Sequence, residues 1–386
     1  MTAPQSPVRA GAYWRPGDDV GERQFASVGG TELDLGGSLP EVTVAYQTWG
    51  ELNAARDNAV LVLHALTGDA HVTGEAGVGH ISEGWWSEVV GPGKAIDTDK
   101  WFVVASNVLG GCQGTTGPSS IAPDGKPWGS RWVRVTVRDQ VVVEARLADE
   151  LGIDRFAAIV GGSMGGLRAL EWLIMFPERV GAAAILACGA AATADQIGTQ
   201  TLQIQAITAD PNWAAGDYYE SPAGPPAAGL GIARRVAHLT YRTEHELADR
   251  FGNESQSGED AFSDDAPGVT AGAGRFAVTS YLDHQAAKMV ERFDAGTYLS
   301  NTDAMSTHDV GRGRGGASKA LADVKVPVAV AGITSDRLYP LHLQQQLVDL
   351  LPTAMQLHEI TSEYGHDGFL LEADAVGRVI SEILPI

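Results

Sequence analysis

The sequence predicts a mostly parallel, doubly wound α/β sheet. The first observation is a series of short, almost wholly apolar segments that end in turns containing glycine, which is typical of strands buried on both faces. They lie at residues 59–64, 101–105, 156–160, 180–187 and 326–331. The second observation is that helical patterns separate several of them, at residues 139–151 and 164–176. Alternating buried strands and helices favour parallel pairing with helices on both faces of the sheet.

The alternation stops after Ala194. Long helical patterns follow, at residues 195–208, 230–251 and 281–293, around a polar segment at residues 252–274. Strand patterns resume at Lys325. We therefore predict a core formed by residues 1–194 and 321–386, with a helical lid and dimerisation insertion at residues 195–320. The polar segment is consistent with either a mobile lid element or a solvated insertion.

The composition excludes several classes of protein. The 386 residues include 27 Lys and Arg against 48 Asp and Glu, a formal charge of −21, which argues against nucleic acid and anionic membranes as partners. Apolar residues make up 44% of the chain, which is enough for a sizeable core. Glycine accounts for 47 residues, well above the usual share of about 7%, so many tight turns are expected.

Cysteine and histidine usage bears on the compartment and on metals. Cys112 and Cys188 are too few for a disulfide framework or a cysteine-based zinc site, and the histidines show no ligand-spaced pair. The N-terminal residues lack the apolar core of a secretory signal. The longest nearly apolar stretch, residues 181–192, is shorter than the roughly 20 residues that span a bilayer. We expect a soluble, cytoplasmic protein without a metal site.

The candidate nucleophile is Ser163. An apolar segment runs into GGSMG at residues 161–165, and a helical pattern follows directly. This is the G-x-S-x-G nucleophile elbow in its required strand–turn–helix setting. The flanking glycines permit a strained turn that lifts the hydroxyl clear of the sheet, beside a helix N-terminus whose free N–H groups favour a developing oxyanion. The competing interpretation is a glycine-rich turn with an idle serine.

A serine hydroxyl becomes a good nucleophile only when a base removes its proton and a third group orients that base. In this architecture the acid and then the histidine follow the serine. Asp336 stands in a polar turn just after the apolar segment at residues 326–331. His366 lies between glycines in YGHDGF, before the final helical pattern at residues 373–383. We predict that Asp336 and His366 complete a triad with Ser163.

Other residues could have filled these roles. Asp309 and Asp323 are rival acids, but neither directly ends an apolar strand. Six further histidines lack both the terminal position and the glycine frame of His366: His238, His245, His284, His308, His342 and His358.

An oxyanion hole needs two preorganised N–H donors. The residue after the nucleophile, Met164, is expected to supply one, and the loop HALTG that follows the early apolar segment is expected to supply the other, from Leu66. His64 in that loop is interpreted as an orienting or packing residue and not as a catalytic one. These residues predict acyl transfer through a serine, with hydrolysis and transfer to another acceptor both open.

Six motifs occur together in a consistent order, within a match that runs from about residue 42 to the C-terminus. They are HALTGD (64–69), NVLGGCQGTTGPSS (107–120), GGSMGG (161–166), ADQI (194–197), ARRVAHLTY (233–241) and YGHDGF (364–369). In this combination the chain resembles the homoserine O-acetyltransferases of methionine biosynthesis.

The resemblance implies a homodimeric α/β-hydrolase fold with a helical lid insertion and a ping-pong reaction through acetyl-Ser163. Acetyl-CoA would be the co-substrate and L-homoserine the acceptor, with no separate cofactor. Arg234 and Asp367 would bind homoserine, through its carboxylate and its ammonium group. Tyr241, seven residues beyond Arg234, is expected to line the same pocket. An ordinary solvated helix face and a turn-forming aspartate are the competing interpretations.

Related reactions stay open at this point. Homoserine O-succinyltransferase, serine O-acyltransferase and carboxylesterase share the same catalytic machinery. The glycine-rich segment at residues 107–120 lacks the spacings of phosphate-binding loops, so we expect it to be structural. Arg312 and Arg314, in a glycine-rich segment of this acidic chain, are a hypothetical site for the CoA phosphates.

Overall fold

The computed structural model describes residues 12–263 and 274–384. Eight strands form one sheet in the order β1-β4-β8-β5-β9-β10-β11-β12. In that order they are Gln24–Ser27, Thr43–Trp49, Phe102–Ser106, Ala59–Leu63, Ala158–Gly162, Ala183–Leu186, Val328–Ile333 and Leu357–Ile360. The six strands from β8 to β12 pair in parallel, which confirms the predicted mostly parallel sheet. Strands β1 and β4 add an antiparallel edge that the apolar pattern did not predict.

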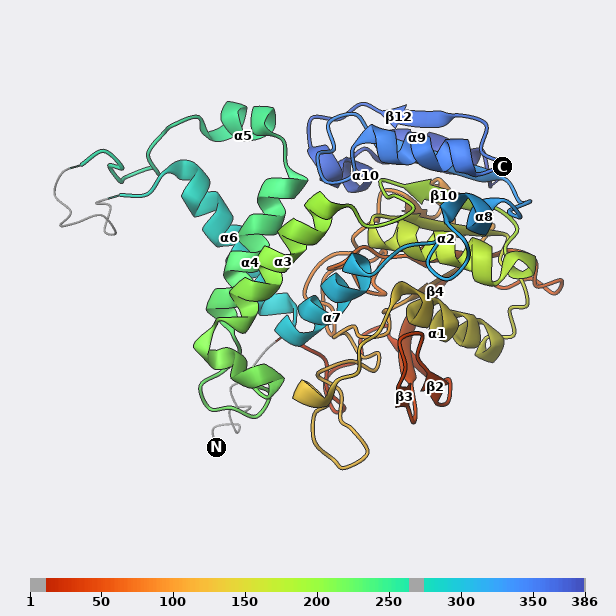
Figure 1. Cartoon of the computed structure of the whole chain (residues 1–386), viewed down its shortest axis with the longest axis horizontal. Coiled ribbons are helices and arrows are strands. Elements are labelled where there is room, and N and C mark those ends of the chain that lie inside the picture. Colours follow the sequence, from red (N-terminus) through yellow and green to blue (C-terminus); the bar gives the residue numbers. More distant parts are fainter. Residues whose placement is uncertain (1–11, 264–273, 385–386) are drawn as a thin grey trace.

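Helices cover both faces of this sheet (Figure 1). Helices α1 (Val137–Glu150), α2 (Met164–Met175) and α9 (Leu341–Leu350) share an apolar cluster with Leu61 and Leu63 of β5. The neighbouring side chains of β5 point to the opposite face, where they cluster with α11 (Ala373–Ser381). Strands buried on both sides explain the uniformly apolar segments of the sequence.

Several short elements complete the part of the chain that the structure describes. They are β2 (Thr31–Glu32), β3 (Ser38–Leu39), β6 (Val90–Gly91), β7 (Ile96–Asp97), α8 (Ala317–Leu321), α10 (Gly368–Leu371), and the 3-10 turns Gly129–Arg131, Pro177–Arg179, Pro211–Gly216 and Gly365–Asp367. Cys112, after β8, and Cys188, after β10, are both buried and form no disulfide.

A second group of helices stands beside the sheet, at the left of Figure 1. It comprises α3 (Ala194–Thr208), α4 (Ala227–Tyr241), α5 (Glu244–Phe251), α6 (Ala277–Arg292) and α7 (Ala295–Ser306). Helix α4 packs against both α3 and α6. The segments that enter and leave the group are tied together, because the Ala192 N–H donates to the His308 carbonyl and the Val310 N–H donates to the Ala190 carbonyl, both at 2.9 Å. The five helices thus form an insertion whose two ends leave and rejoin the core side by side.

The single helix predicted at residues 230–251 is wrong. Helix α4 ends at Tyr241, and Arg242 adopts an extended backbone with φ −95° and ψ 155°. Thr243 then caps α5, since its Oγ1 accepts the Glu246 N–H at 3.0 Å. A threonine at an N-cap stabilises a new helix start, typically by about 1 kcal/mol, so the chain breaks there. The central part of the polar segment, residues 264–273, lies outside the described residues.

None of the described helices is long and apolar enough to cross a membrane. Within residues 12–263 and 274–384, no three histidine, cysteine or acidic side chains come together in a way that could hold a metal ion.

Candidate active site

Ser163 lies in the sharp turn between β9 and α2, with φ 56° and ψ −125°. A positive φ is strained for a residue with a side chain, and such strain clusters at functional sites. The flanking glycines allow the turn to pack closely. A Cβ on Gly161 would lie 2.4 Å from the Gly165 carbonyl oxygen, and one on Gly165 would lie 2.1 Å from the Leu63 carbonyl oxygen. A larger residue at position 161 would therefore open the turn itself, and one at position 165 would force the elbow away from β5.

The structure brings the three predicted triad residues together. The imidazole Nε2 of His366 lies 2.9 Å from the Ser163 Oγ, and its Nδ1 lies 2.6 Å from the Asp336 Oδ2. All three side chains are buried. The distances are those of a nucleophile hydrogen-bonded to its base and a base hydrogen-bonded to the group that orients it.

The loops that carry the acid and the base are tied to each other. The second carboxylate oxygen of Asp336 accepts the N–H groups of Leu338 and Tyr339, both at 2.8 Å. The hydroxyl of Ser335 donates to the Ser362 carbonyl at 2.6 Å and accepts the Gly365 N–H at 3.1 Å. These contacts hold the carboxylate against the imidazole and leave it little freedom to rotate.

The protonation of His366 depends on this pairing. Burial on its own lowers the pKa of the imidazole, but the charge of Asp336 and the hydrogen bond to it raise the pKa, with a smaller contribution from Asp367. The net result is a pKa above the ordinary histidine value. An imidazole stabilised as imidazolium is suited to take a proton from a hydroxyl.

The two predicted oxyanion donors flank the serine. Leu66, in the loop after β5, lines the same cavity as Ser163, and Met164 begins α2. In the part of the chain that the structure describes, neither backbone N–H has a hydrogen-bond acceptor. Two free N–H groups beside a nucleophile are what an oxyanion hole requires.

The cavity above Ser163 has a volume of about 380 Å³ and is rich in charged side chains. Four of its lining residues are cationic, Arg234, Arg242, Lys288 and Arg292, and three are acidic, Asp69, Glu83 and Asp367. In a chain of net charge −21, this is a local excess of positive charge. The cavity is therefore suited to an anionic ligand.

The two predicted substrate-binding residues both line this cavity. Arg234, on α4, has no hydrogen bond or ion pair to any described residue; its guanidinium lies 5.7 Å from the ring centre of Tyr241. Its Nε is buried without a partner. Asp367 instead pairs with the Arg242 Nη1 at 3.2 Å, and Arg242 is also held by Glu246. Arg234 is thus a cavity cation without an acidic partner among the described residues, as is Lys288, and its guanidinium is available to meet a carboxylate.

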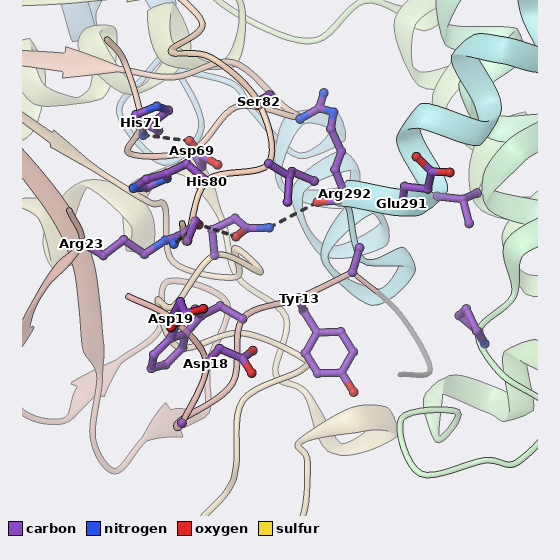
Figure 2. A pocket seen from close by; sticks show the side chains of 18 residues that line it. Tyr13, Asp18, Asp19, Arg23, Asp69, His71, His80, Ser82, Glu291 and Arg292 are labelled. Carbon is purple, nitrogen blue, oxygen red and sulfur yellow. Dashed lines mark hydrogen bonds between the residues drawn. The ribbon is translucent and has the colours of Figure 1, made fainter. Parts of the chain in front are cut away.

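A second cavity, of about 760 Å³, adjoins the first and shares Asp69, His71, Ser82 and Arg292 with it. Figure 2 shows Arg292, the last residue of helix α6, across this space from Asp69, His71 and His80, with Glu291 beside it on the same helix. The lining includes four acidic residues, Asp18, Asp19, Asp69 and Glu291, against the two arginines Arg23 and Arg292. This balance is unfavourable for phosphate groups.

Several cavity residues were not predicted from the sequence. Arg292 donates to the Thr67 carbonyl at 2.9 Å and so joins the end of α6 to the loop of Leu66. Arg242 would have been hard to find, because its partner Asp367 is 125 residues away. Arg312 and Arg314, the hypothetical phosphate site, pair with Asp34 and Glu171 respectively, and neither lines the catalytic cavity. Their acidic partners argue against a role for these two arginines in binding the CoA phosphates.

Comparison with known proteins agrees with this geometry. The family model for the alpha/beta hydrolase fold matches residues 58–373. A homoserine O-acetyltransferase from Nocardia farcinica is 55% identical over 386 residues, which cover all of this chain and 98% of the relative. One from Mycobacterium tuberculosis is 57% identical over 364 residues, covering 94% of this chain and 93% of the relative.

Solved structures give the same fold. The esterase E22 aligns with a TM-score of 0.83 at 26% identity, covering 94% of this chain and 99% of that one. The homoserine O-acetyltransferase from Bacillus anthracis aligns with a TM-score of 0.83 at 24% identity, covering 94% and 97%. The fold alone therefore does not separate esterases from transferases, whereas the full-length sequence identity does. The chain belongs to the homoserine O-acetyltransferase family, within the alpha/beta hydrolase fold.

Proposed function

We propose that this protein transfers an acetyl group from acetyl-CoA to the hydroxyl of L-homoserine, in methionine biosynthesis, through an acetyl-Ser163 intermediate. The observation that carries the proposal is the hydrogen-bonded series Asp336–His366–Ser163 beneath a cationic cavity. The membership of the family supports the choice of substrates.

In the first half-reaction, the Ser163 oxygen attacks the thioester carbonyl carbon while the His366 Nε2 accepts the hydroxyl proton. The resulting oxyanion accepts hydrogen bonds from the Leu66 and Met164 N–H groups. The C–S bond then breaks, and His366 gives its proton to the departing CoA sulfur. Asp336 stays ionised and holds the Nδ1–H tautomer throughout.

In the second half-reaction, the homoserine hydroxyl attacks the acetyl carbon as His366 removes its proton. The C–O bond to Ser163 breaks, and the proton returns to the serine oxygen. We propose that Arg234 holds the homoserine carboxylate through a bidentate pair. Asp367, already beside Arg242, would pair with the ammonium group.

The environment of Arg234 favours a transferase over an esterase. A guanidinium that faces a cavity without an internal acidic partner is costly unless a ligand supplies the anion. Homoserine brings a carboxylate, whereas a simple acetyl ester does not. The unpaired Arg234 guanidinium therefore favours an acceptor that carries a carboxylate.

The test follows CoA thiol release from acetyl-CoA and from succinyl-CoA, each with and without L-homoserine or L-serine. We expect a single burst of about one CoA per chain from acetyl-CoA alone, and sustained release only with homoserine. Sustained release without any acceptor would assign hydrolysis instead. Faster turnover with succinyl-CoA or with serine would reassign the donor or the acceptor.

Replacing Ser163 by alanine tests the intermediate. We expect turnover to fall by at least about 10⁴-fold, because the residual rate comes only from binding and the oxyanion donors. Mass spectrometry of the native chain after acetyl-CoA treatment should find one acetyl group on Ser163. Near-normal transfer by Ser163→Ala would overturn the acyl-serine mechanism.

We also propose that residues 195–320 form a lid and the interface of a cytoplasmic homodimer. Helices α3 and α4 carry exposed apolar side chains that support this surface: Ile197, Leu202, Ile232 and Leu239. Sedimentation velocity should show a dimer for the native chain and a shift toward monomer for Leu202→Lys. Met355→Lys, at an even more exposed apolar residue outside this insertion, is the matched control. An equal effect of both variants would argue against the interface.

A further inference from the structure

His64, at the end of β5, is buried and takes no part in the proton transfers described above. Its side chain makes two hydrogen bonds within the protein. The imidazole Nε2 lies 3.1 Å from the Val108 backbone nitrogen, and the Nδ1 lies 2.7 Å from the Ala65 carbonyl oxygen. A backbone N–H can only donate and a carbonyl can only accept. The Nε2 must therefore be unprotonated, and the Nδ1 must carry the hydrogen.

The Ala65 carbonyl belongs to the peptide group whose N–H is that of Leu66. In a trans peptide the C=O and the N–H point in opposite directions, and the described chain contains no cis peptide bond. Fixing the direction of the Ala65 carbonyl thus fixes the direction of the Leu66 N–H. The Gly68 N–H also donates to this carbonyl at 3.0 Å, so the oxygen is held from two sides.

We propose that His64 is a positioning residue, whose neutral Nδ1–H tautomer holds the Ala65–Leu66 peptide with the Leu66 N–H directed at the developing oxyanion. The proposal rests on the role of Leu66 in the proposed function. It gives this imidazole a task different from that of His366, namely to prevent a peptide flip that would turn the Ala65 carbonyl toward the oxyanion.

The surroundings of His64 keep it neutral. An imidazolium would turn the Nε2 into a donor facing the Val108 donor. The Arg168 guanidinium, from α2, donates to the His64 carbonyl and is itself paired with Glu144 of α1. Burial first, and then the charge of Arg168, lower the pKa of His64 to about 3, so the same tautomer persists across the working pH range.

The glycine at position 68 makes this arrangement possible. A Cβ there would lie 2.8 Å from the Cβ of His64, closer than two such atoms can approach. The loop can fold back over the imidazole only because this side chain is missing. The H-x-x-x-G spacing of residues 64–68 therefore encodes the tight turn.

Two substitutions separate the two hydrogen bonds. In His64→Asn the amide can still donate near the Nδ1 position, but no atom reaches the Val108 N–H. In His64→Gln the longer side chain can accept from Val108 while the donor to Ala65 is lost. We expect the burst rate constant for acylation by acetyl-CoA to fall about 10²-fold in His64→Gln, as for loss of one oxyanion donor, and less than about 10-fold in His64→Asn. The apparent affinity for acetyl-CoA should change little in either variant.

Equal losses in the two variants, or a larger loss in His64→Asn, would overturn the proposal and assign His64 a packing role. Thermal melting of both variants controls for misfolding. A measurement on the native chain covers the case in which neither variant folds. In protein with ¹⁵N-labelled histidine, we expect the His64 imidazole to carry its proton on Nδ1 at pH 5 to 8. An Nε2–H tautomer or an imidazolium in that pH range would also overturn the proposal that His64 positions the Ala65–Leu66 peptide. A native chain that shows no acylation burst would instead contradict the proposed function, and the tautomer would still be measurable.

Discussion

The acid–base region around His366 and the loop around His64 use the same side chain in opposite ways. The two histidines are almost equally buried, with 3% of His366 and 1% of His64 exposed, yet the pKa of His366 is raised and that of His64 is lowered to about 3. The difference comes from their partners. His366 faces the carboxylate of Asp336, whereas His64 faces a backbone N–H and lies near the Arg168 guanidinium. Partners, rather than burial, decide which imidazole can exchange protons.

The largest effect is expected when His366, like His64, has no carboxylate partner. Asp336→Asn removes the carboxylate, so we expect kcat/KM for acetyl-CoA to fall by about 10⁴-fold as the wrong tautomer becomes populated. His366 must be neutral to act as a base, and its raised pKa sets the acid limb of the native pH profile above the ordinary value of about 6.5. The variant's limb should therefore move to lower pH. A limb that stays in place, or moves up, would contradict this assignment.

The second prediction perturbs the His64 region. Arg168 is fully buried, and Arg168→Met leaves the Glu144 carboxylate without its cation. Leaving one charge of a buried pair unpaired costs about 3–5 kcal/mol of unfolding free energy, measurable by denaturant titration. The double variant Arg168→Met/Glu144→Gln is the control. It should recover a large part of the loss, since glutamine can still accept the Trp172 Nε1–H, which lies 2.9 Å from Glu144 in the native chain. No recovery would show that the charge of Glu144 is not the cause.

The third prediction compares two neighbouring arginines of α4. Arg234→Ala should lower kcat/KM for homoserine by about 10²-fold, the range expected when one partner of a buried charge pair is removed. The burst of CoA from acetyl-CoA should be nearly unchanged. Arg235, which pairs with Asp283 at the surface, is the matched control, and Arg235→Ala should leave both half-reactions almost intact. Equal effects would remove Arg234 from the acceptor site.

The smallest effect is expected at Arg312, which does not line the catalytic cavity. Arg312 pairs with Asp34 at a partly exposed site, so Arg312→Ala should cost no more than about 1 kcal/mol of stability. The apparent KM for acetyl-CoA should stay the same. A large rise in that KM would restore Arg312 as a phosphate-binding residue.

Local patterns were enough to predict the parallel sheet and the positions of the triad. Ser163 and Asp336 each follow a strand whose apolar pattern is visible in the sequence, and His366 was identified by its glycine frame before the final helix. Parallel strands then bring their carboxyl ends to one edge of the sheet. The antiparallel strands β1 and β4 were not predicted, because β1 is mostly exposed and β4, although four of its seven residues are buried, mixes polar with apolar residues.

Long-range hydrogen bonds account for most of what the sequence could not predict. The tautomer of His64 is set by Val108, 44 residues away, and Arg292 contacts Thr67 across 225 residues. Neither contact leaves a periodic signal, because each depends on the packing of whole elements. The break between α4 and α5 is different in kind. Thr243 marked it locally, but the continuous helical pattern on either side concealed the cap.

The two buried cysteines have a practical consequence for the measurement of CoA release. Burial raises the pKa of the Cys112 thiol to about 12, and it also raises that of Cys188. The thiolate is the reactive form, so a disulfide reagent at neutral pH should detect released CoA and ignore the folded protein. Denaturant should then expose two further thiols per chain. One sample can thus give the number of active sites, from the CoA thiol released in the burst, and the number of protein chains, from the cysteine thiols exposed by denaturant.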